Sequence, residues 1–290
     1  MRQKLKLWLK QFPFLVRWKR KVWSQMDGST GISKLDVLAL FPLYVPYTGG
    51  KYREKAGLTI QAINQTIPFL SELSRTVAGG LQPVKEIVDF PRTEQERQAA
   101  NSLKGRLDFY GSDKANDHNY HHLYGALLSN AESIENIFEI GLGTNNTEIA
   151  ANMGAAGRPG ASLRAFRDFC PKARVYGADI DKRVLFTEDR IETFYLDQTD
   201  PATFADVRQN LPADFDLVID DGLHAPSANI ESLRFGLQIV KPGGWVVVED
   251  ISSQAISLWQ VVSAILPSKR YASHILKADG AFVFAVQRLN

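Results

Sequence analysis

The sequence predicts an α/β protein built on a doubly wound, mostly parallel sheet with helices on both faces, preceded by a mainly helical N-terminal extension. The first observation is that, from about residue 110 onward, short apolar segments alternate with segments of helical periodicity. That alternation is typical of βαβ units. The second is that several apolar segments run directly into acidic residues or glycine, as strands do at the binding edge of an open sheet.

The composition fits one large domain with an extension, because the chain has 290 residues, of which 44% are hydrophobic and 23% charged. A single cysteine, Cys170, excludes an internal disulfide bond and favours a reducing compartment. We expect no membrane span, since a span needs roughly 20 consecutive apolar residues. A cytoplasmic location follows as the expectation.

Residues 1–30 are predicted to form a basic amphipathic arm. Residues 1–23 hold eight Lys or Arg and no acidic residue, whereas residues 24–290 hold 26 basic and 32 acidic residues. An arm with basic and tryptophan side chains suits an anionic membrane surface, here the inner face of the cell membrane. A solvated or partner-packed helical extension fits equally well. The mildly acidic body argues against nucleic acid as a partner, and the sequence leaves homo-oligomer formation open.

Residues 31–109 are predicted to be a helical N-terminal region, and residues 110–290 a separate domain. Thr59 can cap a helix that ends near Gly79 and Gly80. The segment TEQE, Thr93–Glu96, is a capping box that should open a second helix reaching to about Leu107.

The later elements follow in order along the chain. The expected strands are Asn136–Gly143, Ala173–Ile180, Ile191–Gln198, Phe215–Asp221, Gly244–Ile251 and Ala281–Leu289. The expected helices between them are Ser162–Phe169, Pro201–Gln209, Ser227–Val240 and Gln254–Leu266. Right-handed crossovers would place the carboxyl ends of the parallel strands on one edge of the sheet.

The first strand leads into a glycine turn that differs from a dinucleotide-binding loop. EIGLGTNN has the pattern G-x-G, but Asn146 stands where a third glycine would be, and the next helix waits until about Ser162. An acidic residue before the first glycine, Glu139, would disfavour a phosphate and favour an amino or cationic group. The alternative is a tight turn without a ligand.

Two further acids end the second and third strands. Asp179 could accept hydrogen bonds from both hydroxyls of a ribose, and Asp197 from an exocyclic amine such as that of adenine. Each acid alone is more simply explained as a solvated loop charge. Three acids at successive strand ends favour a ligand.

Several segments resemble a known family. EIGLG, YGADID, YLDQTD, FDLVIDDGLH and KPGGWVVVEDI look like the motif series of class I S-adenosylmethionine-dependent methyltransferases. IDDGLH followed by VVVEDI, together with GASLRAF and GSDKANDHNYHHLY, is similar to the metal-dependent sugar O-methyltransferases of macrolide tailoring. The resemblance covers about residues 110–287. It implies a Rossmann-like, seven-stranded sheet and a methyltransferase domain over residues 110–290.

The resemblance also implies roles for particular residues. Six are implied to bind S-adenosylmethionine: Glu139, Gly141 and Gly143 at the methionine and ribose, Asp179 at the ribose, and Asp197 and Gln198 at the adenine. Three carboxylates are implied to ligate Mg²⁺ or another divalent cation: Asp221, Glu249 and Asp250. His224 is implied to be the general base.

This chemistry is coherent, because a sugar hydroxyl is a poor nucleophile and a hard cation held by carboxylates lowers its pKa. A histidine can then accept the proton. Simpler interpretations stay open. Asp220, or less readily Asp221, could cap the next helix, and His224 could be structural. Glu249 and Asp250 could form a solvated strand end.

Four other residues are noted without an assigned role. The three histidines that precede an apolar helix could line a substrate pocket or lie on the surface: His118, His121 and His122. Cys170 is expected to be buried at a helix end and not to be a nucleophile.

The sequence therefore predicts an S-adenosylmethionine-dependent, metal-assisted O-methyltransferase. The acceptor would be a sugar hydroxyl of a glycosylated natural product or a surface polysaccharide. One alternative is an O-methyltransferase of another small molecule, such as a catechol-like phenol. The other is a non-catalytic protein that binds nucleotides or scaffolds membranes.

Overall fold

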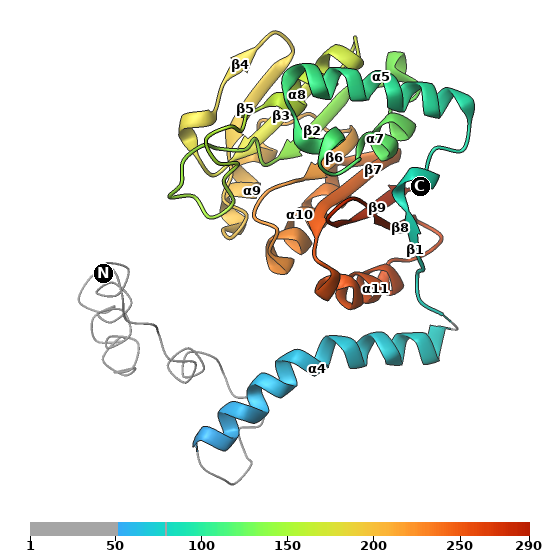
Figure 1. Ribbon diagram of the computed structural model, residues 1–290, viewed down its shortest axis with the longest axis vertical. Coiled ribbons are helices and arrows are strands. Elements are labelled where there is room, and N and C mark those ends of the chain that lie inside the picture. The colour runs from blue at the N-terminus through green and yellow to red at the C-terminus, as the bar shows by residue number, and fades with distance from the viewer. Residues whose placement is uncertain (1–51, 79) are drawn as a thin grey trace, which may run out of the picture. The chain divides into compact units, whose positions relative to one another are not determined.

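The computed structural model describes residues 52–78 and 80–290, so the basic arm predicted at residues 1–30 lies outside the described residues (Figure 1). The chain divides into two units, Met1–Leu70 and Ser71–Asn290. Helix α4, Tyr52–Ala78, begins before the cap expected at Thr59. Among the described residues, no helix combines the length and the apolar character that crossing a bilayer requires.

The second unit contains one mixed sheet, which confirms the predicted α/β class. The described residues form nine strands, in the order β1-β8-β9-β7-β6-β2-β3-β5-β4, and not the seven expected. Their bounds are β1 Val84–Glu86, β2 Asn136–Ile140, β3 Arg174–Asp179, β4 Thr187–Glu188, β5 Ile191–Tyr195, β6 Phe215–Asp220, β7 Val240–Ile251, β8 Tyr271–Lys277 and β9 Phe282–Arg288. The two outermost strands, β1 and β4, are only three and two residues long, so they leave almost no pattern in the sequence.

Five neighbouring strands run parallel: β7, β6, β2, β3 and β5. From β2 the chain winds outward to β3 and β5, and then returns to β6 on the other side of β2. The winding therefore reverses at β2 and β6. Ligands of open α/β sheets bind beyond the carboxyl ends of the strands at such a reversal.

Helices cover both faces of the sheet (Figure 1). One face carries α5 Glu94–Tyr110, α6 Asp113–Asn116, α7 His121–Leu127 and α8 Ala161–Phe169, and the other carries α9 Pro201–Arg208, α10 Pro226–Ile239 and α11 Ile256–Ile265. Short 3₁₀ helices lie at Ile87–Asp89, Ala131–Ser133, Lys182–Val184 and Ser253–Ala255.

The two faces follow from the two-residue period of the strands. Ile137, Leu217 and Val247 belong to the core beneath the first helix layer. Their chain neighbours Phe138 and Val218 belong to the core on the opposite face. By the same alternation, Glu139 and Glu249 should point toward the layer of α5 to α8.

The capping box predicted for α5 is confirmed. Thr93 Oγ accepts from the amide of Glu96 at 3.2 Å, and Glu96 Oε2 accepts from the amide of Thr93 at 3.0 Å. The helix ends at Gly111, whose φ of 75° is left-handed. Helix α5 packs on α7 and α8 within the unit that begins at Ser71. The division of the sequence at residue 110 stays a prediction.

Candidate functional site

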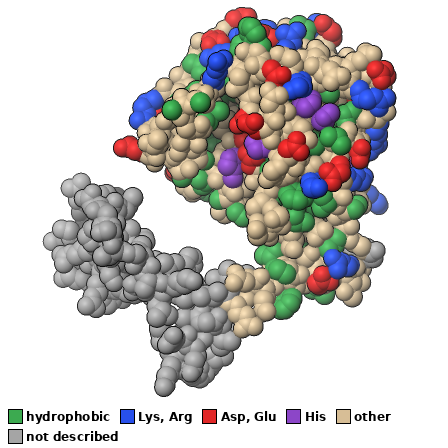
Figure 2. All heavy atoms as spheres, in the orientation of Figure 1, with side chains coloured by type: hydrophobic (Ala, Val, Ile, Leu, Met, Phe, Trp, Pro, Cys, Tyr) green, Lys and Arg blue, Asp and Glu red, His purple; other side chains and the backbone are tan. Residues whose placement is uncertain are grey.

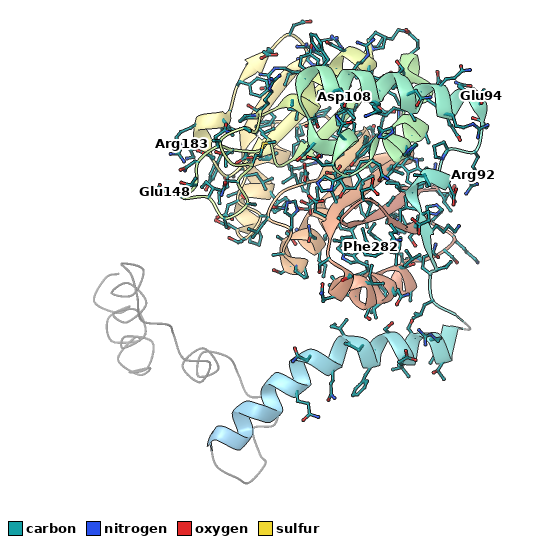
Figure 3. The ribbon with its side chains drawn as sticks, in the orientation of Figure 1. Arg92, Glu94, Asp108, Glu148, Arg183 and Phe282 are labelled. Carbon is teal, nitrogen blue, oxygen red and sulfur yellow. The ribbon has the colours of Figure 1, made fainter. Side chains whose placement is uncertain are left out.

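A cavity of about 530 Å³ opens at the carboxyl edge of the parallel strands, a volume in the range of small-molecule sites. Its wall contains eight of the ten residues that the sequence singled out: Gly141, Gly143, Asp179, Asp197, Gln198, Asp221, His224 and Asp250. Part of the wall comes from the loop that follows β2 and carries Glu148, labelled in Figure 3. Figure 2 shows acidic and histidine side chains beside one another on one face of the unit Ser71–Asn290.

The glycines of the β2 turn have left-handed backbone conformations and close neighbours. Gly141 has φ of 96°, and a Cβ there would lie 2.0 Å from the carbonyl oxygen of Asp221. Gly143 has φ of 77°, and a Cβ there would lie 1.9 Å from Met153 Sδ. Glycine alone adopts this conformation readily and fits this space. The turn therefore brings the backbone after β2 directly against the end of β6.

Asp179, at the end of β3, is held in place by two backbone amides. Its Oδ1 accepts from the amide of Asp181 at 2.8 Å, and its Oδ2 accepts from the amide of Leu142 at 2.9 Å. Burial raises the pKa of this carboxyl, and the backbone donors partly oppose the rise. Each carboxylate oxygen has further acceptor capacity, so the fixed group can still bind a ligand that enters the cavity.

Gln198 lies on the cavity wall, and both ends of its side-chain amide bond to the protein. Its Nε2 donates to Asp220 Oδ1 and to Ser232 Oγ, both at 2.7 Å, and its Oε1 accepts from the amide of Leu223 at 2.7 Å. The side chain amide is thus used to fix the loop after β6. Asp197 lies beside it on the cavity wall and is partly buried.

Asp220 is not the helix cap that the sequence suggested. The residue at the cap position of α10 is Ala225, which forms no side-chain cap bond. Asp220 is 1% exposed and accepts from Asn229 Nδ2 at 2.8 Å. It joins β6 to α10 through a buried side-chain contact and leaves Asp221 as the carboxylate that faces the cavity.

Asp221, His224 and Asp250 each offer one ligand atom, and these atoms lie within 4.8 Å of one another. His224 Nε2 is 3.6 Å from Asp250 Oδ2, while Asp250 Oδ1 accepts from the hydroxyl of Tyr120 at 2.5 Å. His224 and Asp250 have φ of 56° and 54°. Non-glycine residues with such backbone strain cluster at functional sites.

Glu249 lies deeper than the other two predicted ligands. It is 1% exposed, and its carboxylate accepts hydrogen bonds from the hydroxyl of Tyr124 and from the ammonium group of Lys114. The same ammonium nitrogen lies 2.6 Å from Asp221 Oδ2. Carboxylate oxygens accept more than one partner, so these contacts leave acceptor capacity on Glu249.

Glu139, which the sequence expects at the cofactor, lies behind the residues that line the cavity. It is 0% exposed, lies 3.2 Å from Lys114 Nζ, and accepts from Ser162 Oγ at 2.8 Å. Lys114 and Ser162 reach the cavity wall in its place. Burial raises the pKa of Glu139 to about 7, against the opposing charge of Lys114.

The charges of this cluster suit a bound cation. Burial disfavours the charge of Lys114, but the carboxylates of Asp221, Glu249 and Glu139 outweigh burial and hold its pKa well above the usual value. Burial also raises the pKa of Glu249. Three carboxylates thus contact one ammonium group, and Asp250 lies close to Asp221 in the same cluster. Oxygen ligands with excess negative charge are what a hard divalent cation requires.

Lys114, Tyr120 and Tyr124 were not singled out from the sequence. They come from GSDKANDHNYHHLY, a segment whose resemblance was noted without a role for these residues. The available signal was a lysine and two tyrosines in a short segment just ahead of the first strand.

The three histidines near α7 and the single cysteine differ in exposure and in their neighbours. His118 is 27% exposed, and its Nδ1 lies 4.0 Å from Asp250 Oδ1, at the margin of the cluster. His121 is buried, and its ring lies against that of His122 at 4.1 Å between centroids. Cys170 is buried at the end of α8, as expected.

Solved structures establish the fold. The MycE methyltransferase of the mycinamycin pathway, determined with Mg, SAH and mycinamycin VI, superposes with a TM-score of 0.53 and 24% identity, over 65% of this chain and 54% of that one. The chain has the fold of a class I methyltransferase. No family model matches the sequence.

Curated relatives of this chain confirm the resemblance that its sequence motifs indicate. A rhamnosyl tetracenomycin-C 2'-O-methyltransferase of Streptomyces olivaceus is 31% identical over 57% of this chain and 43% of its own length. The mycinamicin VI 2''-O-methyltransferase of Micromonospora griseorubida is 39% identical over 32% of this chain and 23% of its own length. The chain therefore spans less than half the length of the curated relatives that it matches.

Proposed function

We propose that this protein transfers a methyl group from S-adenosylmethionine to a sugar hydroxyl with the help of a divalent cation, Mg²⁺ by preference. The observation that carries the proposal is the meeting of two sets of residues at one cavity. The glycine turn and Asp179 line the same cavity as Asp221, His224 and Asp250, and ligand atoms of the last three lie within 4.8 Å of one another. A methyl donor and an activated hydroxyl have to meet in this way.

The donor would occupy the part of the cavity formed by the ends of β2, β3 and β5. Gly141 and Gly143 line the cavity there, and Asp179 offers a fixed carboxylate to a ribose. Asp197 would face the adenine. Gln198 would act by holding the wall, since both ends of its amide already have partners in the protein.

The cation would be held by Asp221 and Asp250, with Glu249 as the third carboxylate. Asp221 and Glu249 contact one ammonium nitrogen, so the two carboxylates already lie close together. A bound divalent cation lowers the pKa of a hydroxyl group that it contacts. His224, at the exposed rim of the same cluster, would take the proton as general base.

The choice of a sugar as acceptor is supported by the relatives, two of which are named as O-methyltransferases of rhamnosyl tetracenomycin-C at the 2' or 3' position. A carboxylate-bound divalent cation with open positions suits vicinal hydroxyl groups, because such cations coordinate oxygen. A glycosylated natural product or a surface polysaccharide would provide them.

The basic segment at residues 1–23 supports a second, separate proposal, namely peripheral contact with an anionic membrane surface. The expected result is that removing residues 1–23 weakens binding to vesicles containing phosphatidylserine, most clearly at low salt. Absence of vesicle binding by the full chain would refute this proposal and leave the enzymatic one untouched.

Calorimetric titration tests the donor part of the proposal. S-adenosylmethionine should bind the full chain with or without Mg²⁺, and more tightly than NAD, because the turn lacks the third glycine of a dinucleotide loop. Failure to bind S-adenosylmethionine, or tighter binding of NAD, would contradict the proposal. A protein that binds the donor and transfers no methyl group to any acceptor would favour a scaffolding role.

A further inference from the structure

Lys114 occupies the centre of the buried carboxylate cluster, and no role in the proposed reaction uses it. Its side chain is 2% exposed, and its Nζ lies 2.6 Å from Asp221 Oδ2 and 3.2 Å from Glu139 Oε1, and contacts Glu249 Oε2. Surface lysines contact solvent, and a lysine is almost never fully buried unless it is paired. This one is paired with carboxylates that come from three adjacent strands, β2, β6 and β7.

The position of Lys114 follows from the local chain. Ser112 caps α6, Asp113–Asn116, by accepting from the amide of Lys114, and the carbonyl of Lys114 accepts from the amide of Tyr120 at 2.7 Å. The segment is therefore fixed at both ends, and the lysine is aimed at the sheet face toward which Glu139 and Glu249 point. Tyr124, from α7, donates to Glu249 from the same helix layer.

Without Lys114, the three carboxylates that it contacts, of which Glu139 and Glu249 are fully buried, would have no lysine or arginine partner among the described residues. Burying unpaired charge is strongly unfavourable. The protein has to assemble these carboxylates whenever the cation is absent, including during folding. A cation that is part of the chain resolves this conflict, because it is present at all times.

We propose that Lys114 is a positioning residue that acts as the resident cation of the carboxylate cluster, holding Asp221 and Glu249 in place before a divalent cation binds. Lys114 comes from α6 and reaches the cavity wall beside these carboxylates, while Asp221 and Asp250 line the cavity in which the metal would bind. Because both cations share ligands, their charges repel, and Lys114 lowers the affinity for the metal while it keeps the empty site folded. The metal part of this inference rests on the proposed function.

For Lys114→Met we expect a lower melting temperature in EDTA and a higher affinity for Mn²⁺. In EDTA, the melting temperature of the variant should fall by about 10 °C, because removing one partner of a buried pair leaves uncompensated charge. The double variant Lys114→Met with Glu249→Gln should recover part of that loss, since one of the unpaired carboxylates is gone. This part of the test needs neither metal nor cofactor.

The second measurement is Mn²⁺ binding to the full chain, followed by electron paramagnetic resonance of the free ion. Lys114→Met should bind Mn²⁺ about tenfold more tightly than the wild type, or tighter still, because the competing positive charge has been removed. Lys114→Arg retains the charge and should stay within about threefold of the wild type. Simple structural damage would have the opposite sign and weaken binding. Lys172→Met, which removes an exposed lysine paired with Glu132, is the matched control and should change neither quantity.

The outcomes separate the two proposals. A Lys114→Met variant that melts like the wild type in EDTA would overturn the role of Lys114 as resident cation. Mn²⁺ binding that is unchanged or weaker in this variant would overturn the shared-ligand geometry. If neither the wild type nor any variant binds Mn²⁺, the metal site of the proposed function is refuted, and so is the competition between Lys114 and the metal. The comparison of melting temperatures still decides whether Lys114 holds the carboxylates in place. If Lys114→Met does not fold, melting of Lys114→Arg and of the double variant decides the first point, since both should fold.

Discussion

Replacement of Asp179 by alanine tests the donor site, because the structure fixes both what the carboxylate holds and what it can offer. The change removes two acceptors, one for the amide of Leu142 at 2.9 Å and one for the amide of Asp181 at 2.8 Å. It also removes the carboxylate that would bind the ribose. The variant should therefore lose both stability and affinity for S-adenosylmethionine.

The two losses have different sizes. Hydrogen bonds to a charged group contribute roughly 1.5–3 kcal/mol, so the dissociation constant for S-adenosylmethionine should rise about 10- to 150-fold. The two orphaned amides cost roughly 1–3 kcal/mol each if they stay dry, and less if water from the cavity replaces the carboxylate. Calorimetry measures the first loss, and urea unfolding measures the second.

Asp179→Asn separates the two effects, because its amide keeps one acceptor oxygen and has no charge. It should recover part of the stability and remain weakened in binding. Asp189→Asn, at a side chain that is 90% exposed, serves as the control and should behave like the wild type. An Asp179→Ala variant that folds and binds S-adenosylmethionine as tightly as the wild type would refute the ribose assignment.

Two further predictions concern histidines. His224→Ala should lower kcat by roughly 10²–10⁴-fold, while the affinity for S-adenosylmethionine, measured by calorimetry, stays unchanged. A variant with the kcat of the wild type would show that His224 is structural. A variant that no longer binds Mn²⁺ would show that His224 is a metal ligand. His121 has a folded-state pKa lowered from 6.5 to about 4, first by burial and then by His122. The unfolded state therefore binds the extra proton between these values, so stability should fall by roughly 1–3 kcal/mol as the pH drops from 6.5 to 4. In urea unfolding, the stability of His121→Asn should fall less than that of the wild type between pH 6.5 and 4. An equal fall would show that other groups cause the pH dependence.

The carboxyl edge of the sheet was predictable because strand period and strand ends are local features of sequence. Asp179, Asp220 and Glu249 each follow an apolar residue at a strand end, and Asp221 and Asp250 come next in the chain. The parallel topology brings such ends together. This rule brings the strand-end acids together, while the assignment of roles to Gln198, His224 and the glycines came from the resemblance to known methyltransferases. The class of fold was predictable for the same reason.

The direction and partners of the side chains were not predictable in this way. Glu139 precedes a glycine turn, and its burial depends on Lys114, which lies 25 positions away along the chain, in a four-residue helix with little periodicity. Gln198 follows a strand end as Asp197 does, yet its amide bonds to Asp220 and Ser232. Such long-range pairings are set by tertiary packing, which strand and helix periods do not encode. The short strands β1 and β4 were missed because they depend on partners more than on their own residues.

The most direct test of the central proposal is methyl transfer itself. The full chain would be incubated with S-adenosylmethionine and a panel of rhamnosylated and other glycosylated acceptors, once with Mg²⁺ and once with EDTA, and the formation of S-adenosylhomocysteine and methylated product would be followed by mass spectrometry. The account predicts a product methylated on a sugar hydroxyl with Mg²⁺, loss of turnover in EDTA and its return when Mg²⁺ is restored. Full turnover in EDTA would contradict the metal role of Asp221, Glu249 and Asp250, and methylation of a catechol in preference to every sugar would contradict the proposed acceptor.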